Sequence, residues 1–145
     1  MSKEVLISIQ SVQNLDGFDS DGPELITMGD YEYAADAIRI SYLETELTGL
    51  GGTKTAFLIR PPEEVTLIRR GTVNAQMVFH AGEKHSFRYQ TGLGTLGLSV
   101  DTRRLEMELD AHGGDLEIVY DLSFERSYLS RNKFIIKVRE KEQKL

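Results

Sequence analysis

The chain has 145 residues, the length of one domain, and it is long enough to bury a hydrophobic core without metals or crosslinks. Lys and Arg number 17 against 23 Asp and Glu, so the net charge is −6 and the pI is near 5.1, which argues against nucleic acid or an anionic membrane as partner. Cysteine is absent, which excludes disulfides and thiolate metal sites and favours a reducing compartment.

The N-terminal segment is typical of a first strand followed by a polar loop. The run "MSKEVLISIQSV" has one basic residue and neither a long apolar stretch nor a cleavage site, so it is not a signal peptide or a membrane span. We therefore expect a cytoplasmic protein. Residues 13–22, "QNLDGFDSDG", are polar and rich in turn-forming residues, and they predict a loop.

Alternation of apolar and polar side chains dominates the rest of the chain. It is clearest in "AIRISYLETEL" (37–47), "DLEIVYDLSF" (115–124) and "KFIIKV" (133–138). Half-buried antiparallel strands produce this pattern because their side chains point alternately to core and water. Turn signals recur between the runs, at "TGLGGT", "RPPEE", "HAGEK" and "AHGGD". The pattern predicts one all-β domain, a meander of about eight to ten strands that closes into a barrel, with a tail (139–145) that frays.

The stretch "TGLGTLG", Thr91–Gly97, contains the G-x-G-x-x-G spacing of dinucleotide-binding loops. Such a loop requires a helix that opens at the third glycine. The residues that follow alternate as a strand does, with Leu105, Met107 and Leu109 on one face. After Asp121 too few residues remain for further α/β units. We therefore predict a tight strand connection here and no site for NAD, FAD or ATP, and we expect no cofactor.

His80 and His85 flank one predicted hairpin turn and raise the question of a metal site. The apolar faces of the two strands bring Phe79 and Phe87 to the same side, which requires a loop with an odd number of residues, of the three-residue kind with Gly82 left-handed. The two imidazoles then point to opposite faces and cannot share a metal. The third histidine lies in a separate turn, and no nucleophile motif occurs, so we predict neither a metal site nor catalytic residues.

Polar residues continue the apolar faces of three predicted strands. Tyr42 and Glu44 extend the face of "AIRISYLETEL", Arg69 that of "EVTLIRRG", and Tyr89 and Thr91 that of "HSFRYQT". If these faces point inward, the barrel holds a carboxylate and a guanidinium, and buried charges are costly unless they are paired. Two interpretations remain open. The pair is a structural plug near an open end, or these five residues line a cavity for a small, partly anionic ligand.

In the ligand interpretation Arg69 anchors the charge, Glu44 orients Arg69, and Tyr42 and Tyr89 form walls and hydrogen-bonding groups. A third alternative pairs Glu44 with Glu46 for acid–base chemistry, as in a small hydrolase or isomerase. A fourth belongs to a different class, a protein–protein interaction module whose barrel is solid and whose edge or rim binds the partner. The sequence also leaves a homodimer open.

The runs "ISYLETELTGLGGTKT", "LIRRG", "MVFHAG" and "YQTGLGTLGLSVDT" resemble the YwiB-like family of small, uncharacterised bacterial proteins, over about Ser8 to Val138. The resemblance implies a lipocalin-like (calycin) antiparallel up-and-down β-barrel over residues 1–145, closed and with an open-ended calyx. The family has no established activity, so it supplies no catalytic residues. This chain has Gly92-Leu93 where the family often has a Pro-aromatic pair, which implies a looser turn. The most specific matches are Tyr42-x-Glu44-Thr45, Arg69-x-Gly71, Phe79 and Tyr89-x-Thr91-x-x-Gly94.

Overall fold

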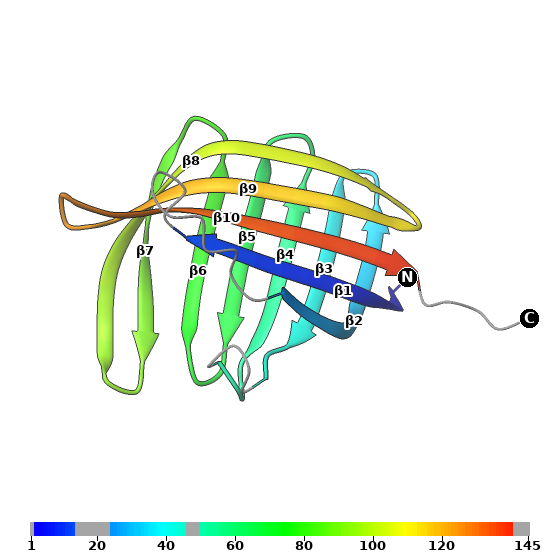
Figure 1. Ribbon diagram of the computed structural model, residues 1–145, viewed down its shortest axis with the longest axis horizontal. Helices are drawn as coiled ribbons and strands as arrows, with labels where there is room; N and C mark the ends of the chain where they lie inside the picture. Colours follow the sequence, from blue (N-terminus) through cyan, green and yellow to red (C-terminus); the bar gives the residue numbers. More distant parts are fainter. Residues whose placement is uncertain (1, 14–23, 46–49, 141–145) are drawn as a thin grey trace, which may run out of the picture.

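A computed structural model of the chain describes residues 2–13, 24–45 and 50–140, and these form a closed antiparallel barrel of ten strands (Figure 1). Each strand pairs with its neighbour in the chain, and the last strand pairs with the first, so the predicted up-and-down barrel is confirmed. None of the described segments forms a helix long and apolar enough to cross a membrane. The strands are β1 (Ser2–Gln13), β2 (Glu24–Ala34), β3 (Ala37–Leu43), β4 (Lys54–Arg60), β5 (Glu64–Arg70), β6 (Asn74–His80), β7 (Lys84–Thr91), β8 (Gly94–Asp110), β9 (Gly113–Phe124) and β10 (Ser127–Glu140).

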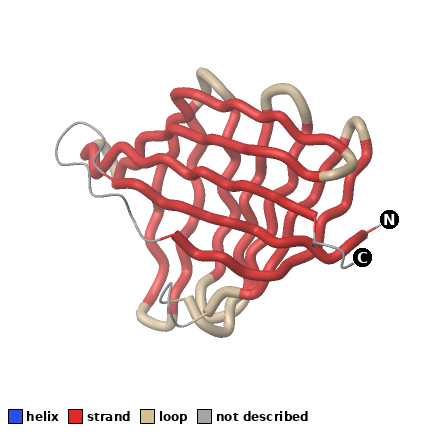
Figure 2. The backbone as a smooth tube through the Cα atoms, turned by 45° about the vertical axis from the view of Figure 1, so that its right-hand side comes forward, coloured by secondary structure: helices blue, strands red, loops and turns tan. Residues whose placement is uncertain are grey.

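The barrel closes through β1, which pairs with β2 on one side and with β10 on the other (Figure 2). Gln13, the first residue of the predicted polar loop, is the last residue of β1, and residues 14–22 of that loop lie outside the described part of the chain. Arg139 and Glu140, at the start of the predicted tail, still belong to β10. Residues 141–145 are not described, so fraying there stays a prediction.

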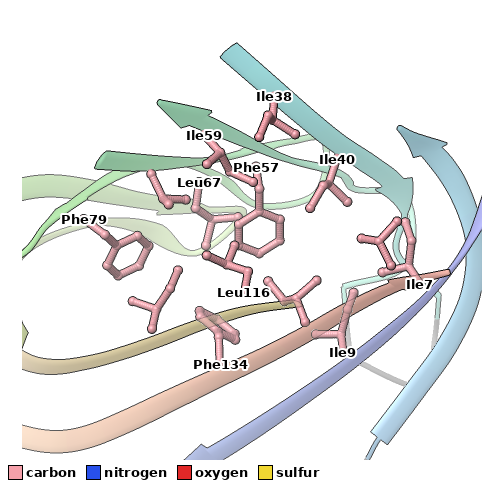
Figure 3. Packing of buried hydrophobic residues seen from close by; sticks show 14 of the residues in the cluster. Ile7, Ile9, Ile38, Ile40, Phe57, Ile59, Leu67, Phe79, Leu116 and Phe134 are labelled. Carbon is pink, nitrogen blue, oxygen red and sulfur yellow. The ribbon is translucent and has the colours of Figure 1, made fainter. Parts of the chain in front are cut away.

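The middle of the barrel is filled by side chains from the inward faces of the strands (Figure 3). Phe57 and Phe134 meet edge to face with ring centroids 6.1 Å apart. The ring centroid of Tyr120 lies 5.0 Å from that of Phe79 and 5.5 Å from that of Phe134. These aromatic contacts join β4, β6, β9 and β10 across the interior. Such aromatic pairs stabilise a fold by more than the burial of their apolar surface alone. Function therefore has to be sought at the ends and in the wall of the barrel rather than at its centre.

The glycine-rich stretch connects two strands, as predicted. β7 ends at Thr91, β8 begins at Gly94, and β8 continues as a strand past Gly97 to Asp110. Gly94 has a φ of 139°, a conformation that only glycine adopts without strain. Because β8 opens no helix, the backbone amides that cradle a pyrophosphate in a dinucleotide fold are not presented here.

The β6–β7 hairpin has the predicted three-residue loop, Ala81–Glu83, with Gly82 at a φ of 79°. His80 and His85 lie at strand positions whose side chains point to opposite faces of the hairpin, yet each contacts Glu83 in the hairpin loop. The distances are 3.2 Å from His80 Nδ1 to Oε2 and 3.0 Å from His85 Nε2 to Oε1. Within residues 2–13, 24–45 and 50–140, no group of three or more His, Asp or Glu residues is arranged to hold a metal ion.

Candidate functional site

A row of inward-facing residues crosses five strands near one end of the barrel. Tyr42 lies opposite Thr55, Thr55 opposite Arg69, Arg69 opposite Ala75, and Ala75 opposite Tyr89. Directly opposed residues of an antiparallel pair place their side chains on the same face, so the five side chains form one continuous row. Ala75 has the smallest side chain in the row and separates Arg69 from Tyr89.

Glu44 extends this row beyond the end of β3. Its amide donates a hydrogen bond of 2.8 Å to the carbonyl of Thr53, which keeps the chain aligned with β4 after the strand ends. The Glu44 side chain is 2 % exposed, and its Oε2 accepts a hydrogen bond of 2.6 Å from Thr55 Oγ1. The same oxygen lies 4.0 Å from Nε of Arg69, so the two charges attract at a distance too long for a hydrogen bond.

Arg69 points inward, as predicted, and the neighbouring Arg70 is exposed. The Arg69 side chain is 16 % exposed, which places its head at the boundary between the packed interior and solvent. Its Nε is buried and has no hydrogen-bond partner among residues 2–13, 24–45 and 50–140. A buried donor without an acceptor is costly, and native structures contain few of them. This nitrogen is therefore the atom at which an additional acceptor would be most stabilising.

Two phenols face this charge pair. Burial raises the pKa of Tyr42 above its usual range, and the negative charge of Glu44 raises it further against the opposing effect of Arg69. Burial also raises the pKa of Tyr120 on β9, and the positive charge of Arg69 opposes that shift. Both phenols are therefore protonated at neutral pH and act as neutral hydrogen-bonding groups. The alternation in "DLEIVYDLSF" puts Tyr120 on the same face as Leu116 and Ile118, but a pattern within one strand does not connect it with Arg69.

Tyr89 and Thr91 are the remaining candidates for ligand binding. Tyr89 is half-buried and packs against the core at the end of the inward row. Thr91 belongs to the β7–β8 turn, where its hydroxyl accepts a hydrogen bond of 3.1 Å from the amide of Leu93 and donates one of 3.4 Å to the carbonyl of Gly94. Its hydroxyl is engaged in the turn rather than with the charge pair. Glu46, the second carboxylate of the acid–base alternative, lies outside the described residues.

A second buried carboxylate is Asp121, which the alternation in "DLEIVYDLSF" places on the outward side of its strand, so the sequence does not indicate its burial. The structure shows it 4 % exposed between two arginines. Arg103 Nε donates to its Oδ2 at 2.7 Å and Arg131 Nε to its Oδ1 at 2.8 Å. The hydrogen bond from Arg131 is the main reason why the pKa of Asp121 is lowered. These contacts tie β8, β9 and β10 together on the outside of the barrel, and we assign them a structural role.

The fold and the site together define a class: a small, closed, up-and-down β-barrel with a packed middle and a charged, tyrosine-lined end. Comparison with known sequences gives the family. The chain belongs to the family described as a domain of unknown function, DUF1934, whose model matches residues 7–136.

Two comparisons concern individual proteins of this kind. The uncharacterized β-barrel protein YwiB of Bacillus subtilis (strain 168) is 29 % identical over 119 residues, which is 81 % of this chain and 80 % of that protein. The crystal structure of the ywiB protein from Bacillus subtilis matches with a TM-score of 0.84 and 24 % identity, covering 97 % of this chain and 94 % of that one. The predicted family resemblance is thus confirmed, and the structural match establishes the shared fold.

Proposed function

We propose that this protein is a non-enzymatic binding module for a small, partly anionic molecule that binds at the charged end of the barrel interior. The observation that carries the proposal is the unpartnered, buried Nε of Arg69. An oxygen of an anionic ligand would accept a hydrogen bond from this donor, and charge-assisted hydrogen bonds of this type are strong. The 16 % exposure of the side chain leaves the guanidinium within reach of a molecule entering from solvent.

The residues around Arg69 suit binding better than proton transfer. Glu44 already accepts a hydrogen bond from Thr55 and faces Arg69, so it holds the guanidinium in place by charge. The raised pKa of Tyr42 keeps its hydroxyl protonated, which makes it a hydrogen-bonding group and not a base at neutral pH. Tyr89, at the far end of the row, supplies an aromatic wall. A few placed polar groups beside apolar walls are typical of small-ligand sites.

The packed centre also favours the alternative, a protein–protein interaction module. Aromatic side chains meet across the middle of the barrel, so a ligand is confined to its end. The β9–β10 hairpin projects beyond the barrel wall (Figure 1). The β7–β8 and β9–β10 hairpins carry exposed apolar side chains, which mark interaction surfaces when they are contiguous. These side chains are Leu93, Leu96, Phe124, Tyr128 and Leu129.

Native mass spectrometry of freshly purified protein tests the ligand proposal. We expect the wild type to retain a small molecule that Arg69→Met loses. Arg70→Met is the matched control, because it removes the neighbouring arginine on the exposed face and should retain the molecule. A wild-type protein free of any small molecule, or an Arg69→Met variant that retains it equally, would favour the interaction module.

A further inference from the structure

The wall of the barrel is not hydrogen-bonded along its full height between β2 and β3. The ladder between these strands runs from Ala34 opposite Ala37 to Asp30 opposite Ser41 and ends there. β2 begins earlier, at Glu24, and residues 24–29 pair with β1 on the other side. Within the described residues, the edge of β2 that faces β3 therefore has no partner strand over residues 24–29.

A groove of about 470 Å³ lies at this interruption. Thr27 and Met28 line it from β2, and Tyr42 and Leu43 from β3. Gly29 marks its closed end, because a Cβ there would lie 2.4 Å from the Ile7 side chain and 2.4 Å from the Ser41 carbonyl oxygen. Only glycine lets β2 press against β3 at this point, and the groove opens beyond it.

The lips of the groove are apolar and exposed. Ile26 and Met28 on β2 are 64 % and 36 % exposed, and Leu43 on β3 is 68 % exposed. These residues share the outer face of the barrel, since their strand positions alternate with those of less exposed neighbours. Exposed apolar side chains beside an open strand edge are the features that recruit an added strand.

The charges that line the groove identify the kind of strand. Two carboxylates at exterior strand positions, Glu4 and Asp30, lie among the lining residues together with one ammonium group, Lys54, whereas the charge of Glu44 faces Arg69 inside the barrel. The whole chain carries a net charge of −6, so a second copy of it would bring like charge to an acidic groove. A basic segment is electrostatically complementary.

We propose that this groove docks an extended, basic segment of a partner protein, which adds as a strand along residues 24–29 of β2. Main-chain hydrogen bonds to the open edge would provide affinity, as in other cases of strand addition. Alternate side chains of the added strand would then contact the apolar lips, and Lys or Arg would lie near Glu4 and Asp30. Tyr42 and Glu44 line both this groove and the Arg69 site. The added strand would contact the outer face of β2 and needs neither Arg69 nor a bound anion, so the two proposals can be tested separately.

The test uses the full chain and a fluorescein-labelled probe peptide, Lys-Val-Lys-Val-Lys-Val, measured by fluorescence anisotropy. Two peptides serve as controls: one N-methylated at every residue after the first, which cannot donate hydrogen bonds to that edge in either strand direction, and one with Glu in place of Lys. We expect the probe to bind, N-methylation to weaken binding by about tenfold or more because several edge hydrogen bonds are lost, and the Glu peptide not to bind. Equal binding of the N-methylated peptide, or no binding of the probe at about millimolar concentration, would overturn the proposal.

The absence of native cysteine allows the groove to be blocked at one position. Leu43→Cys modified with a bulky maleimide should bind the probe with an affinity lower by about tenfold or more, because the label fills the groove. Glu32→Cys with the same label is the matched control, since Glu32 is exposed on β2 but lies in the intact ladder opposite Arg39. Arg69→Met should bind the probe as the wild type does. Probe binding that survives the label at position 43, or that depends on Arg69, would place the peptide elsewhere and refute this docking surface.

Discussion

Replacing the two members of the Glu44–Arg69 pair one at a time should have unequal costs, although the charges are equal. At 4.0 Å the charges attract by about 4 kcal/mol at an effective dielectric constant of about 20. Arg69→Met forfeits this attraction and leaves Glu44 without its counter-charge, although Glu44 keeps the hydrogen bond from Thr55. It also removes the buried Nε donor that has no acceptor within the described residues, whose burial costs about 1–3 kcal/mol. We therefore expect Arg69→Met to lower the free energy of unfolding by about 1–3 kcal/mol.

Glu44→Leu should be more destabilising, by about 3–5 kcal/mol, because it leaves a largely buried guanidinium without its counter-charge. It also removes the acceptor of the Thr55 hydroxyl. Glu44→Gln keeps that acceptor and should fall between the two. The double variant Glu44→Leu/Arg69→Met should recover much of the loss, since neither charge is left unpaired.

Urea unfolding at pH 7 measures these differences, followed by far-UV circular dichroism because the chain has no tryptophan. Arg70→Met is the control and should change the free energy of unfolding by at most about 0.5 kcal/mol, since its side chain is exposed. If Arg69→Met proves as costly as Glu44→Leu, Arg69 is a structural plug and the argument from its free donor fails. Additive losses in the double variant would show that the two charges do not interact.

Other features give further tests. Asp121→Asn should lower the free energy of unfolding by about 2–3 kcal/mol at pH 7 in urea titrations. The pKa of Asp121 in the folded protein lies below its ordinary value of 3.8, so ionised Asp121 stabilises the fold above that pH, and this stabilisation is lost as the pH falls through the folded pKa. The free energy of unfolding of Asp121→Asn should therefore fall less steeply than that of the wild type as the pH is lowered. A variant as acid-sensitive as the wild type would contradict this. Gly97→Ala should leave the melting temperature nearly unchanged, whereas Gly114→Ala should lower it, since a Cβ at Gly114 would lie 1.8 Å from a carbonyl oxygen and Gly97 has open space. Calorimetry should detect no binding of NAD, FAD or ATP with a micromolar dissociation constant. Binding of any of them would show that the prediction of no nucleotide site at the glycine-rich stretch is wrong. Chelators should not shift the melting temperature, and a shift would reveal a metal that contributes to folding.

Local patterns in the sequence predicted most of what determines the site. The inward direction of Tyr42, Glu44 and Arg69 follows from alternation within single strands, because the side chains of a strand have a period of two. The same parity argument gave the three-residue loop around Gly82. Adjacent strands of a meander are also neighbours in the chain, so the approach of β3, β4 and β5 that brings Glu44 to Arg69 needs no long-range information.

The parts that failed depend on neighbouring strands and on distance across the barrel. Asp121 does lie on the outward side of its strand, but Arg103 and Arg131 from the two neighbouring strands cover it there, and alternation within one strand does not reveal such cover. The charge of Arg69 acts on Tyr120 from a strand that is distant in the wall, and which strands approach one another across the interior is set by the shear of the whole barrel. The choice between a cavity and a packed centre depends on how the aromatic side chains fill the interior, which the sequence pattern leaves undetermined.

The central claim is that Nε of Arg69 is a free donor that an anionic ligand satisfies, and NMR of the arginine side chains tests it most directly. Titration of ¹⁵N-labelled protein with small carboxylates should produce a saturable downfield shift of one Nε–Hε resonance. That resonance should disappear in Arg69→Met and persist in Arg70→Met. If the Arg69 resonance stays unchanged, or if the exposed arginines shift just as much, the charged end of the barrel is not a ligand site.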